Sequence, residues 1–201
     1  MKNTPAGSSI LKVLATWAAL AMLAGWLGVV ELVPFPPAII MGLVVTTLVT
    51  LRLRRGWWVL ATTLDPRLYL IPHLSRFVGF YFLALYEQGR LPYDFAVLGG
   101  WGDIVVASGV ALLLILRIKN RVTLFVWNLV GLADILFVAY TATRLMLTDP
   151  ESMSELMHLP LALLPLFVVP MIVISHLLLN IRLLTCPDKA QAREVQPGLL
   201  E

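Results

Sequence analysis

Long apolar stretches alternate with shorter polar ones along this 201-residue chain. Six of the apolar stretches are about as long as the roughly 20 residues of helix that cross a hydrocarbon core about 30 Å thick. The pattern therefore predicts an all-α integral membrane bundle of six transmembrane helices, at residues 13–33, 35–53, 70–88, 95–116, 122–143 and 159–183.

Composition supports the same fold class. The chain is 59% hydrophobic and 13% charged, whereas a soluble domain carries about 25% charged residues. Its mean hydropathy is +0.87, so a water-soluble protein is excluded. The formal net charge of +3 comes from cations that flank the spans, and it therefore does not indicate nucleic-acid binding.

The positively charged residues indicate how the helices are oriented. Arg90 and Arg144 fall on one side of the predicted bundle and Arg76 falls within a span, whereas the other 12 of the 15 cations fall on the opposite side. Because Lys and Arg collect in cytoplasmic loops, both termini are expected in the cytoplasm. The cations on that side are Lys2, Lys12, Arg52, Arg54, Arg55, Arg67, Arg117, Lys119, Arg121, Arg182, Lys189 and Arg193. The other side collects Glu31, Asp94, Asp149, Glu151 and Glu155.

The remaining segments fit a single transmembrane domain over residues 1–186. The first span has no A-x-A-like cleavage signal after it, so we expect a retained helix rather than a cleaved signal peptide. Residues 54–72 are too charged to cross the membrane and contain Trp57 and Trp58, which favours a position along the cytoplasmic interface. The polar tail at residues 187–201 is expected to be disordered.

The sequence contains no familiar catalytic or cofactor motif. Its single cysteine, Cys186, excludes an intramolecular disulfide and a CxxC redox pair. The glycine-rich nucleotide motifs, HExxH and GxSxG do not occur. We therefore predict no catalytic residue, no metal site and no cofactor, and an enzyme is the less favoured class.

Five polar side chains lie well inside the predicted spans, where an ionisable residue costs about 2.5–3.5 kcal/mol and usually has a partner. They are Arg76, Asp103, Asn128, Asp134 and His176. At about 1.5 Å of rise per residue, Arg76, Asn128 and His176 lie nearer the cytoplasmic edge, and Asp103 and Asp134 lie near the midplane. These five residues are the candidate ligand-binding or proton-relay residues, arranged in two polar layers.

Asp103 and Asp134 are expected to approach one another or to share a partner. Two close carboxylates cannot both ionise without a counter-charge, so they either share a proton or lie beside a cation such as Arg76. The alternative for both residues is a structural role in pairing neighbouring helices. The same alternative applies to Asn128, which can hydrogen-bond across helices.

Three further residues are secondary candidates: His73, Glu87 and Asn180. His73 and Glu87 share a predicted inward face of the third span with Arg76, Phe80 and Leu83, because their spacing alternates between three and four. The alternative is that His73 and Arg76 extend to the cytoplasmic headgroups and Glu87 marks the outer end. Asn180 shares a face with His176.

The sixth span contains Pro160, Pro165 and Pro170. Proline inside a helix removes a backbone hydrogen bond and clashes with the preceding turn, so a bend is expected near Pro165 or Pro170. His176 then lies beyond the last bend, and we expect it to face the interior.

Several short patterns occur together: Arg76-x-x-Gly79-x-x-Phe82, Gly89-Arg90-Leu91-Pro92-x-x-Phe95-Ala96 with Gly102-Asp103, Trp127-Asn128-x-x-Gly131-x-x-Asp134, and Pro170 followed by His176-Leu177. Over about residues 70 to 183, the chain resembles a group of small, uncharacterised bacterial polytopic inner-membrane proteins. This resemblance implies a multi-pass protein of the bacterial inner membrane, and it implies no particular mechanism.

Three classes of function follow from these residues. The first is a binding or translocation module for a proton, an ion or a small amphiphile, since transporters place polar sites near the midplane beside broken helices. The second is a non-catalytic subunit or scaffold of a membrane complex. The third is a haem-binding or lipid-modifying enzyme in which His73 and His176 approach each other. The expected partners are membrane lipids and, in the second class, other membrane-protein subunits.

Overall fold

The computed structural model describes residues 5–33 and 35–185, and the regular elements in these two segments are helical. The α-helices are α1 (Pro5–Trp26), α2 (Pro37–Leu53), α3 (Arg55–Thr63), α4 (Pro66–Leu70), α5 (Gly79–Glu87), α6 (Gly100–Ile115), α7 (Arg121–Thr148) and α8 (Val169–Thr185). Two 3-10 helices are η1 (Ile71–Val78) and η3 (Pro150–Met157), and two π-helical segments are η2 (Asp94–Gly99) and η4 (Leu164–Val168). The predicted tail lies outside the described residues, as do Lys2, Lys189 and Arg193.

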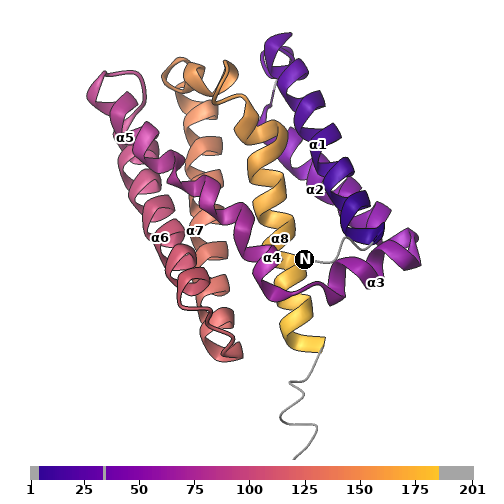
Figure 1. The fold of residues 1–201 in the computed structure, drawn as a ribbon. Helices are drawn as coiled ribbons and strands as arrows, with labels where there is room; N and C mark the ends of the chain where they lie inside the picture. The colour runs from indigo at the N-terminus through magenta and orange to yellow at the C-terminus, as the bar shows by residue number, and fades with distance from the viewer. Residues whose placement is uncertain (1–4, 34, 186–201) are drawn as a thin grey trace, which may run out of the picture.

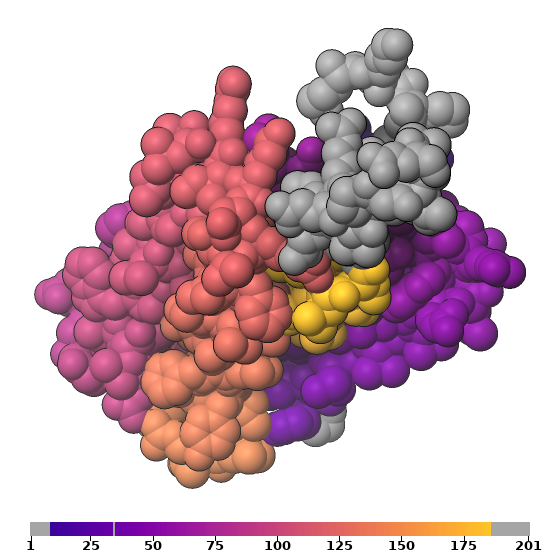
Figure 2. Space-filling view, turned by 90° about the horizontal axis from the view of Figure 1, so that it is seen from below, coloured from indigo at the N-terminus to yellow at the C-terminus, as the bar shows by residue number. Residues whose placement is uncertain are grey.

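The long helices run up and down beside one another in a bundle. In Figure 1, α1, α5 and α7 end at the top of the molecule, whereas α2, α6 and α8 end at the bottom. α8 packs against both α2 and α7. Figure 2, which views the molecule from below, shows the end of α8 in yellow between the α6–α7 pair and the purple segment formed by α2 and α3. α8 is therefore the central helix on which the two sides of the bundle pack.

Five helical segments in the described part of the chain are long and apolar enough to cross a membrane. They are Ser9–Trp26, Pro66–Glu87, Asp94–Ile115, Arg121–Thr148 and Leu164–Thr185. The other predicted span forms α2, which has 17 residues and turns by 109° into α3. The number of spans is therefore five, or six if α2 and α3 are taken as one bent span, and these apolar helices fit a membrane protein.

Local signals explain where several helices begin. The side chain of Asn120 accepts a hydrogen bond from the Thr123 amide over 3.0 Å, which caps α7. The side chain of Asp65 accepts one from the Arg67 amide over 2.9 Å and Pro66 is the first residue of α4. The third span consequently begins four residues before its predicted start at residue 70.

The inward face of the third span differs from the prediction. The sequence analysis placed Phe80 and Glu87 on this face, but both are exposed. The buried residues instead recur every third position: Leu70, His73, Arg76, Gly79, Phe82 and Leu85. A 3-10 helix has about 3.0 residues per turn, so the 3-10 conformation of η1 keeps every third side chain on one face. The prediction assumed α-helical spacing throughout and was wrong about Phe80 and Glu87.

The fourth and sixth spans each begin with a π-helical turn. Pro165 lies in η4 and Pro170 is the second residue of α8, so the sixth span is irregular where the sequence predicts a bend. His176 is fully buried, in agreement with the predicted interior position. Residues 159–162 form turns, so the helical part of this span begins later than predicted.

The buried apolar residues form separate clusters with a polar belt between two of them. One cluster contains Val110 of α6 and Leu124 of α7, and another contains Phe95 of η2 and Val138 of α7. The polar belt lies between these clusters. It consists of the segment of α7 from Asn128 to Asp134 and the polar side chains that contact this segment. The membrane-embedded polar residues therefore lie in the middle of the bundle rather than at its ends.

Small residues allow the third and fourth spans to approach closely. A methyl group built on Gly79 would lie 2.3 Å from the carbonyl oxygen of Gly100, and one built on Gly100 would lie 3.0 Å from the carbonyl oxygen of Gly79. No side chain larger than hydrogen fits at Gly79 without moving backbone. This close contact brings η1 against α6 at the level of the polar belt.

The upper end of the bundle is joined by exposed ion pairs. Arg90 donates through Nε and Nη2 to the two carboxylate oxygens of Glu155, over 2.9 and 2.7 Å. Arg144 pairs with Asp94 over 2.5 Å. These pairs link the connections of the bundle, but exposed ion pairs contribute little to stability.

Replacing Gly79 by Ala should destabilise the bundle by about 1–3 kcal/mol, because the new methyl group must displace the backbone of α6. Gly42→Ala is the matched control, since a methyl group there meets nothing within 4 Å. Unfolding of both variants in mixed micelles, followed by circular dichroism, measures the difference. Equal stability of the Gly79 and Gly42 variants would contradict the close approach of the two spans.

Candidate functional site

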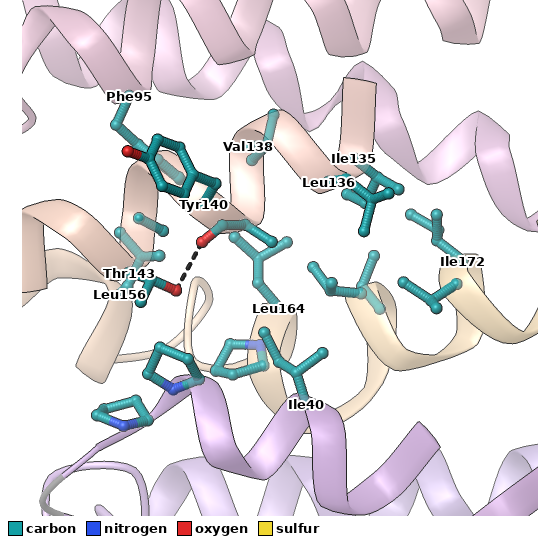
Figure 3. Close-up of a pocket in the computed structure, with 18 of the residues that line it drawn as sticks. Ile40, Phe95, Ile135, Leu136, Val138, Tyr140, Thr143, Leu156, Leu164 and Ile172 are labelled. Carbon is teal, nitrogen blue, oxygen red and sulfur yellow. Dashed lines mark hydrogen bonds between the residues drawn. The ribbon is translucent and has the colours of Figure 1, made fainter. Parts of the chain in front are cut away.

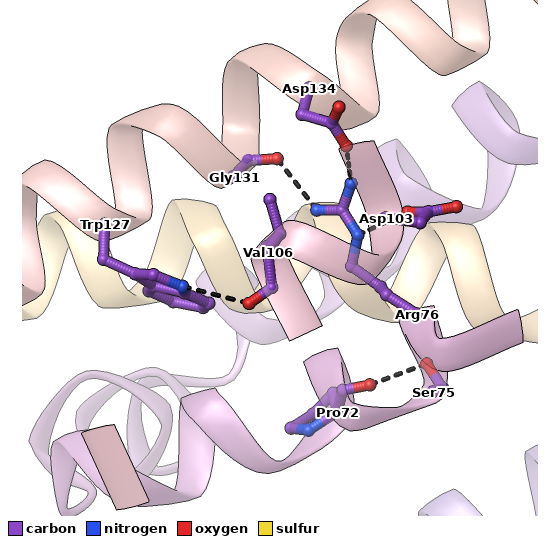
Figure 4. Close-up of polar contacts among 8 residues, drawn as sticks. All are labelled: Pro72, Ser75, Arg76, Asp103, Val106, Trp127, Gly131 and Asp134. Carbon is purple, nitrogen blue, oxygen red and sulfur yellow. Dashed lines mark hydrogen bonds and ion pairs between the residues drawn. The ribbon is translucent and has the colours of Figure 1, made fainter. Parts of the chain in front are cut away.

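Arg76 joins three helices at the centre of the polar belt. Its Nε donates to Oδ1 of Asp103 on α6 over 2.6 Å, and its Nη1 donates to the Gly131 carbonyl oxygen on α7 over 3.0 Å. Its Nη2 donates to Oδ2 of Asp134, also on α7. Figure 4 shows the guanidinium group between the two carboxylates, with Gly131 on the same side as Asp134. Arg76 is 1% exposed.

This arrangement has the shared partner that the sequence predicts for Asp103 and Asp134. Both carboxylates bind the Arg76 guanidinium group, and each accepts a hydrogen bond from a different nitrogen of that group. A buried charge is stable only when it is paired and hydrogen-bonded. With one positive and two negative groups, the cluster has a formal net charge of −1 when both carboxyl groups are ionised.

The predicted two-layer arrangement is wrong for Arg76. The helical rise predicts Arg76 in the lower layer with Asn128 and His176, whereas its guanidinium group lies with Asp103 and Asp134. The depth was calculated with an α-helical rise of about 1.5 Å per residue, but a 3-10 helix rises by about 2.0 Å. The length of the arginine side chain adds further reach toward the midplane.

Asp134 fits against α6 because position 102 is a glycine. A methyl group built on Gly102 would lie 1.9 Å from Oδ1 of Asp134. Trp127, two turns earlier on α7, donates from its indole nitrogen to the Val106 carbonyl oxygen over 3.2 Å, as Figure 4 also shows. These contacts hold α6 and α7 together on both sides of the Arg76 guanidinium group.

Asn128 and His176 form a second polar network below this cluster. Asn128 Nδ2 donates to the His176 carbonyl oxygen over 3.2 Å, so its Oδ1 is the acceptor that faces Nδ1 of His176 at 2.8 Å. Nδ1 of His176 consequently carries the hydrogen. Nε2 of His176 has no hydrogen-bond partner of standard geometry in the described part of the chain.

His73 joins this network through Ser175. The Ser175 hydroxyl group donates to the Ile172 carbonyl oxygen over 2.7 Å, so it accepts a hydrogen bond from Nε2 of His73 over 3.0 Å. Nδ1 of His73 is buried and has no partner among the described residues. Sequence reasoning missed Ser175, although its position directly before His176 was a usable signal.

The two histidines do approach each other, but their geometry does not fit haem. Axial ligation would place an iron atom and the porphyrin plane between the two imidazole rings. The ring centroids of His73 and His176 are 4.2 Å apart, so the rings are in direct contact and leave no space for a porphyrin. Within the described residues, no group of three or more His, Cys, Asp and Glu side chains could hold a metal ion.

The other two secondary candidates lie away from the Arg76 cluster. Glu87 is exposed at the end of α5. Asn180 lies on α8 one turn after His176, and its Oδ1 is buried without a partner in the described segments. Neither residue contacts Arg76, Asp103 or Asp134 through a hydrogen bond or an ion pair that the described structure contains.

A groove with a volume of about 360 Å³ runs along the bundle between α2 and α7. Its walls are almost entirely apolar, with Ile40 on α2 opposite Val138 on α7, and Ile172 on α8 to one side of them, as Figure 3 shows. Thr143 is polar, but its hydroxyl group donates to the Ala139 carbonyl oxygen over 2.7 Å. Ligand pockets typically have volumes of roughly 300–1,000 Å³ and similar apolar walls.

The groove reaches the ion pair of Arg76 and Asp103 at its inner end. Arg76 and Asp103 are both among the residues that line it. At its rim, Met41 of α2 and Tyr140 of α7 are 64% and 66% exposed, so the groove opens on the outer surface of the bundle. The sequence offered no signal for this feature, because its apolar lining residues resemble those of any transmembrane helix.

Replacing Arg76 by Ala should destabilise the bundle by about 3–5 kcal/mol, because it leaves two carboxylates without their counter-charge. Asp134→Asn should be much milder, since it keeps the hydrogen-bond acceptor and leaves Arg76 paired with Asp103. Unfolding in mixed micelles, followed by circular dichroism, compares the variants. Arg90→Ala is the control at an exposed ion pair and should change stability little. A loss of stability in Arg76→Ala no larger than that in Arg90→Ala would refute the stabilising role of the Arg76 ion pairs.

The sequence was compared with known proteins and structures. No curated protein and no solved structure matches the chain. Residues 34–184 match the family described as "Domain of unknown function (DUF8737)", and this region includes the whole polar cluster and the groove. Because the match covers most of the 201 residues, the chain belongs to this family.

Proposed function

We propose that this protein binds a small amphiphile from the surrounding membrane. The apolar chain of the ligand lies in the groove between α2 and α7, and its polar group lies at the inner end beside Arg76 and Asp103. The observation that carries the proposal is that one continuous groove joins an apolar wall to a buried ion pair.

The position of the groove supports an amphiphile over a free ion. An ion that entered from the bilayer would lose its hydration along walls that offer almost no polar groups, and such desolvation is costly. An acyl or alkyl chain that leaves the hydrocarbon core for this groove exchanges one apolar environment for another. Only its polar group then needs a partner, which Arg76 and Asp103 supply.

We further propose that the chain crosses the cytoplasmic membrane of a bacterium six times, with both termini in the cytoplasm. The cation asymmetry across the loops favours this orientation. The up-and-down order of the helices in Figure 1 fits it if α2 counts as a span. α3, which turns by 109° from α2 and carries Trp57 and Trp58, then lies along the cytoplasmic interface.

Filling the groove should weaken binding of an amphiphile. Ala139 lines the groove, so Ala139→Trp should reduce capture of an alkyl alcohol about tenfold or more, by occupying the space of the chain. The probe carries a diazirine on its chain and is photo-crosslinked to the full chain in phosphatidylcholine nanodiscs. Mass spectrometry then maps and counts the labelled residues.

Ala133→Trp is the matched control, because Ala133 is exposed on the same helix and does not line the groove. Its labelling should equal that of the unmodified protein. Labelling spread evenly over all lipid-facing helices, or unaffected by Ala139→Trp, would contradict the proposed function. A defined complex in which another protein fills the groove would favour the scaffold class instead.

The orientation is tested by cysteine labelling of intact cells. With Cys186 replaced by Ser, single cysteines at Lys119 and Glu151 should react from opposite sides of the membrane, because an odd number of crossings separates them. A membrane-impermeant maleimide should label the Glu151 variant in intact cells and the Lys119 variant only after permeabilisation. Labelling of both from outside would refute the topology.

A further inference from the structure

The Arg76 cluster carries more negative than positive groups. Its single guanidinium group is shared by two carboxylates, and each carboxylate uses one oxygen for that contact. The neighbouring histidines do not supply the missing positive charge, because Nδ1 of His73 and Nε2 of His176 are buried without a partner in the described part of the chain, and a second hydrogen on either ring would be an unpaired buried donor. One negative charge is therefore left to be balanced by something else.

Three other charged or titratable side chains on the elements packed around the cluster have partners elsewhere. Arg182 of α8 donates to the Leu64 carbonyl oxygen at the lower end of the bundle. Tyr69 of α4 donates its hydroxyl hydrogen to the Ala61 carbonyl oxygen. Arg144 of α7 pairs with Asp94 at the upper end. None of these three residues can neutralise the extra carboxylate through a direct contact.

The two carboxylates are not equally placed for a ligand. Asp103 lines the groove together with Arg76, whereas Asp134 does not. The Asp103 side chain is 6% exposed and that of Asp134 is 17% exposed, so Asp134 is the more exposed of the two although it does not line the groove. Asp103 accepts from Arg76 through Oδ1, and its Oδ2 has no hydrogen bond to the described residues.

We propose that the polar group of the bound amphiphile is a protonated amine. Resting on the proposed function, this inference names the ligand class: an alkyl chain in the groove and an ammonium group beside Asp103. The ammonium group supplies the positive charge that the cluster lacks and donates hydrogen bonds to the Asp103 carboxylate. A carboxylate head would instead add a second unbalanced negative charge, and an alcohol would leave the imbalance unchanged.

An inorganic cation fits this site less well than an amine on a chain. Apart from the Asp103 carboxylate, few polar side chains line the groove, and the Thr143 hydroxyl group already donates to the Ala139 carbonyl oxygen, so little could replace the hydration shell of such an ion. An alkylammonium ion needs few polar partners, because its chain already favours the groove. The combination of an apolar path and a net negative end is therefore specific to a cationic amphiphile.

The test uses three photo-crosslinking probes with the same diazirine-bearing dodecyl chain and an ammonium, a hydroxyl or a carboxylate head. The full chain is placed in nanodiscs of phosphatidylcholine, which has no net charge to attract the amine. The ammonium probe should label the groove at a concentration about tenfold or more below that of the alcohol, and the carboxylate should be the weakest.

Two variants connect this preference to charge. Asp103→Asn removes the groove-facing carboxylate, and Asp134→Asn removes the surplus charge without changing the groove lining. Both should bring the ammonium and hydroxyl probes to similar labelling. Glu151→Gln, an exposed acidic residue of η3, is the control and should retain the preference. If Asp103→Asn does not fold, as judged by size exclusion, Asp134→Asn decides the test.

The outcomes separate the inference from the proposed function. Failure of all three probes to label the groove would overturn the proposed function. Groove labelling without an amine preference would overturn only this inference. The surplus negative charge would then be neutralised by a proton bound to one of the two carboxyl groups. An amine preference that survives in Asp134→Asn would also overturn it, because charge balance would not be the cause.

Discussion

A guanidinium group buried in the middle of an apolar bundle is the constraint on which the rest of this structure depends. Arg76 would be very unfavourable there without counter-charges, so Asp103 and Asp134 must both lie within hydrogen-bond distance of it. These three residues belong to η1, α6 and α7. Their pairing therefore requires three segments, which are separated in sequence, to meet at one point.

The backbone around Arg76 is adapted to this requirement. The 3-10 conformation of η1 places His73, Arg76 and Gly79 on one face. Gly79 and Gly100 then allow the segment to approach α6 closely enough for Arg76 to reach Asp103, and Gly102 leaves space for Asp134. The glycines at the start of the fourth span thus serve both close packing and the geometry of the ion pairs.

The polar belt also divides into two parts with different properties. His73, Asn128, Ser175 and His176 make hydrogen bonds that link η1, α7 and α8, and none of these four residues lines the groove. The Arg76 cluster is open on one side to the groove and has unequal numbers of positive and negative groups. A network away from the groove is suited to structure, whereas a cluster that is open to the groove and unbalanced in charge is suited to binding.

The sequence alone was sufficient for the helical fold and for several of the polar residues inside the bundle, although it did not single out Ser175. Apolar runs of this length are compatible only with helices that cross or fill an apolar layer, and ionisable groups inside them need partners. For these reasons Arg76, Asp103, Asn128, Asp134 and His176 could be identified before their contacts were seen. The irregular start of the sixth span was also indicated, because proline acts on its own backbone.

Only the tertiary structure decided which residues meet and where the bundle is open. The 3-10 conformation of η1 changed the inward face from that of an α-helix, so Glu87 is exposed and Arg76 lies at the level of the two aspartates. Helix type over a few turns depends on neighbouring segments as well as on local sequence. The groove is formed by residues of α2, α7 and α8 whose apolar side chains would suit lipid contact equally well. Its existence depends on how these helices pack, and one-dimensional patterns of polarity contain no information about the space between them.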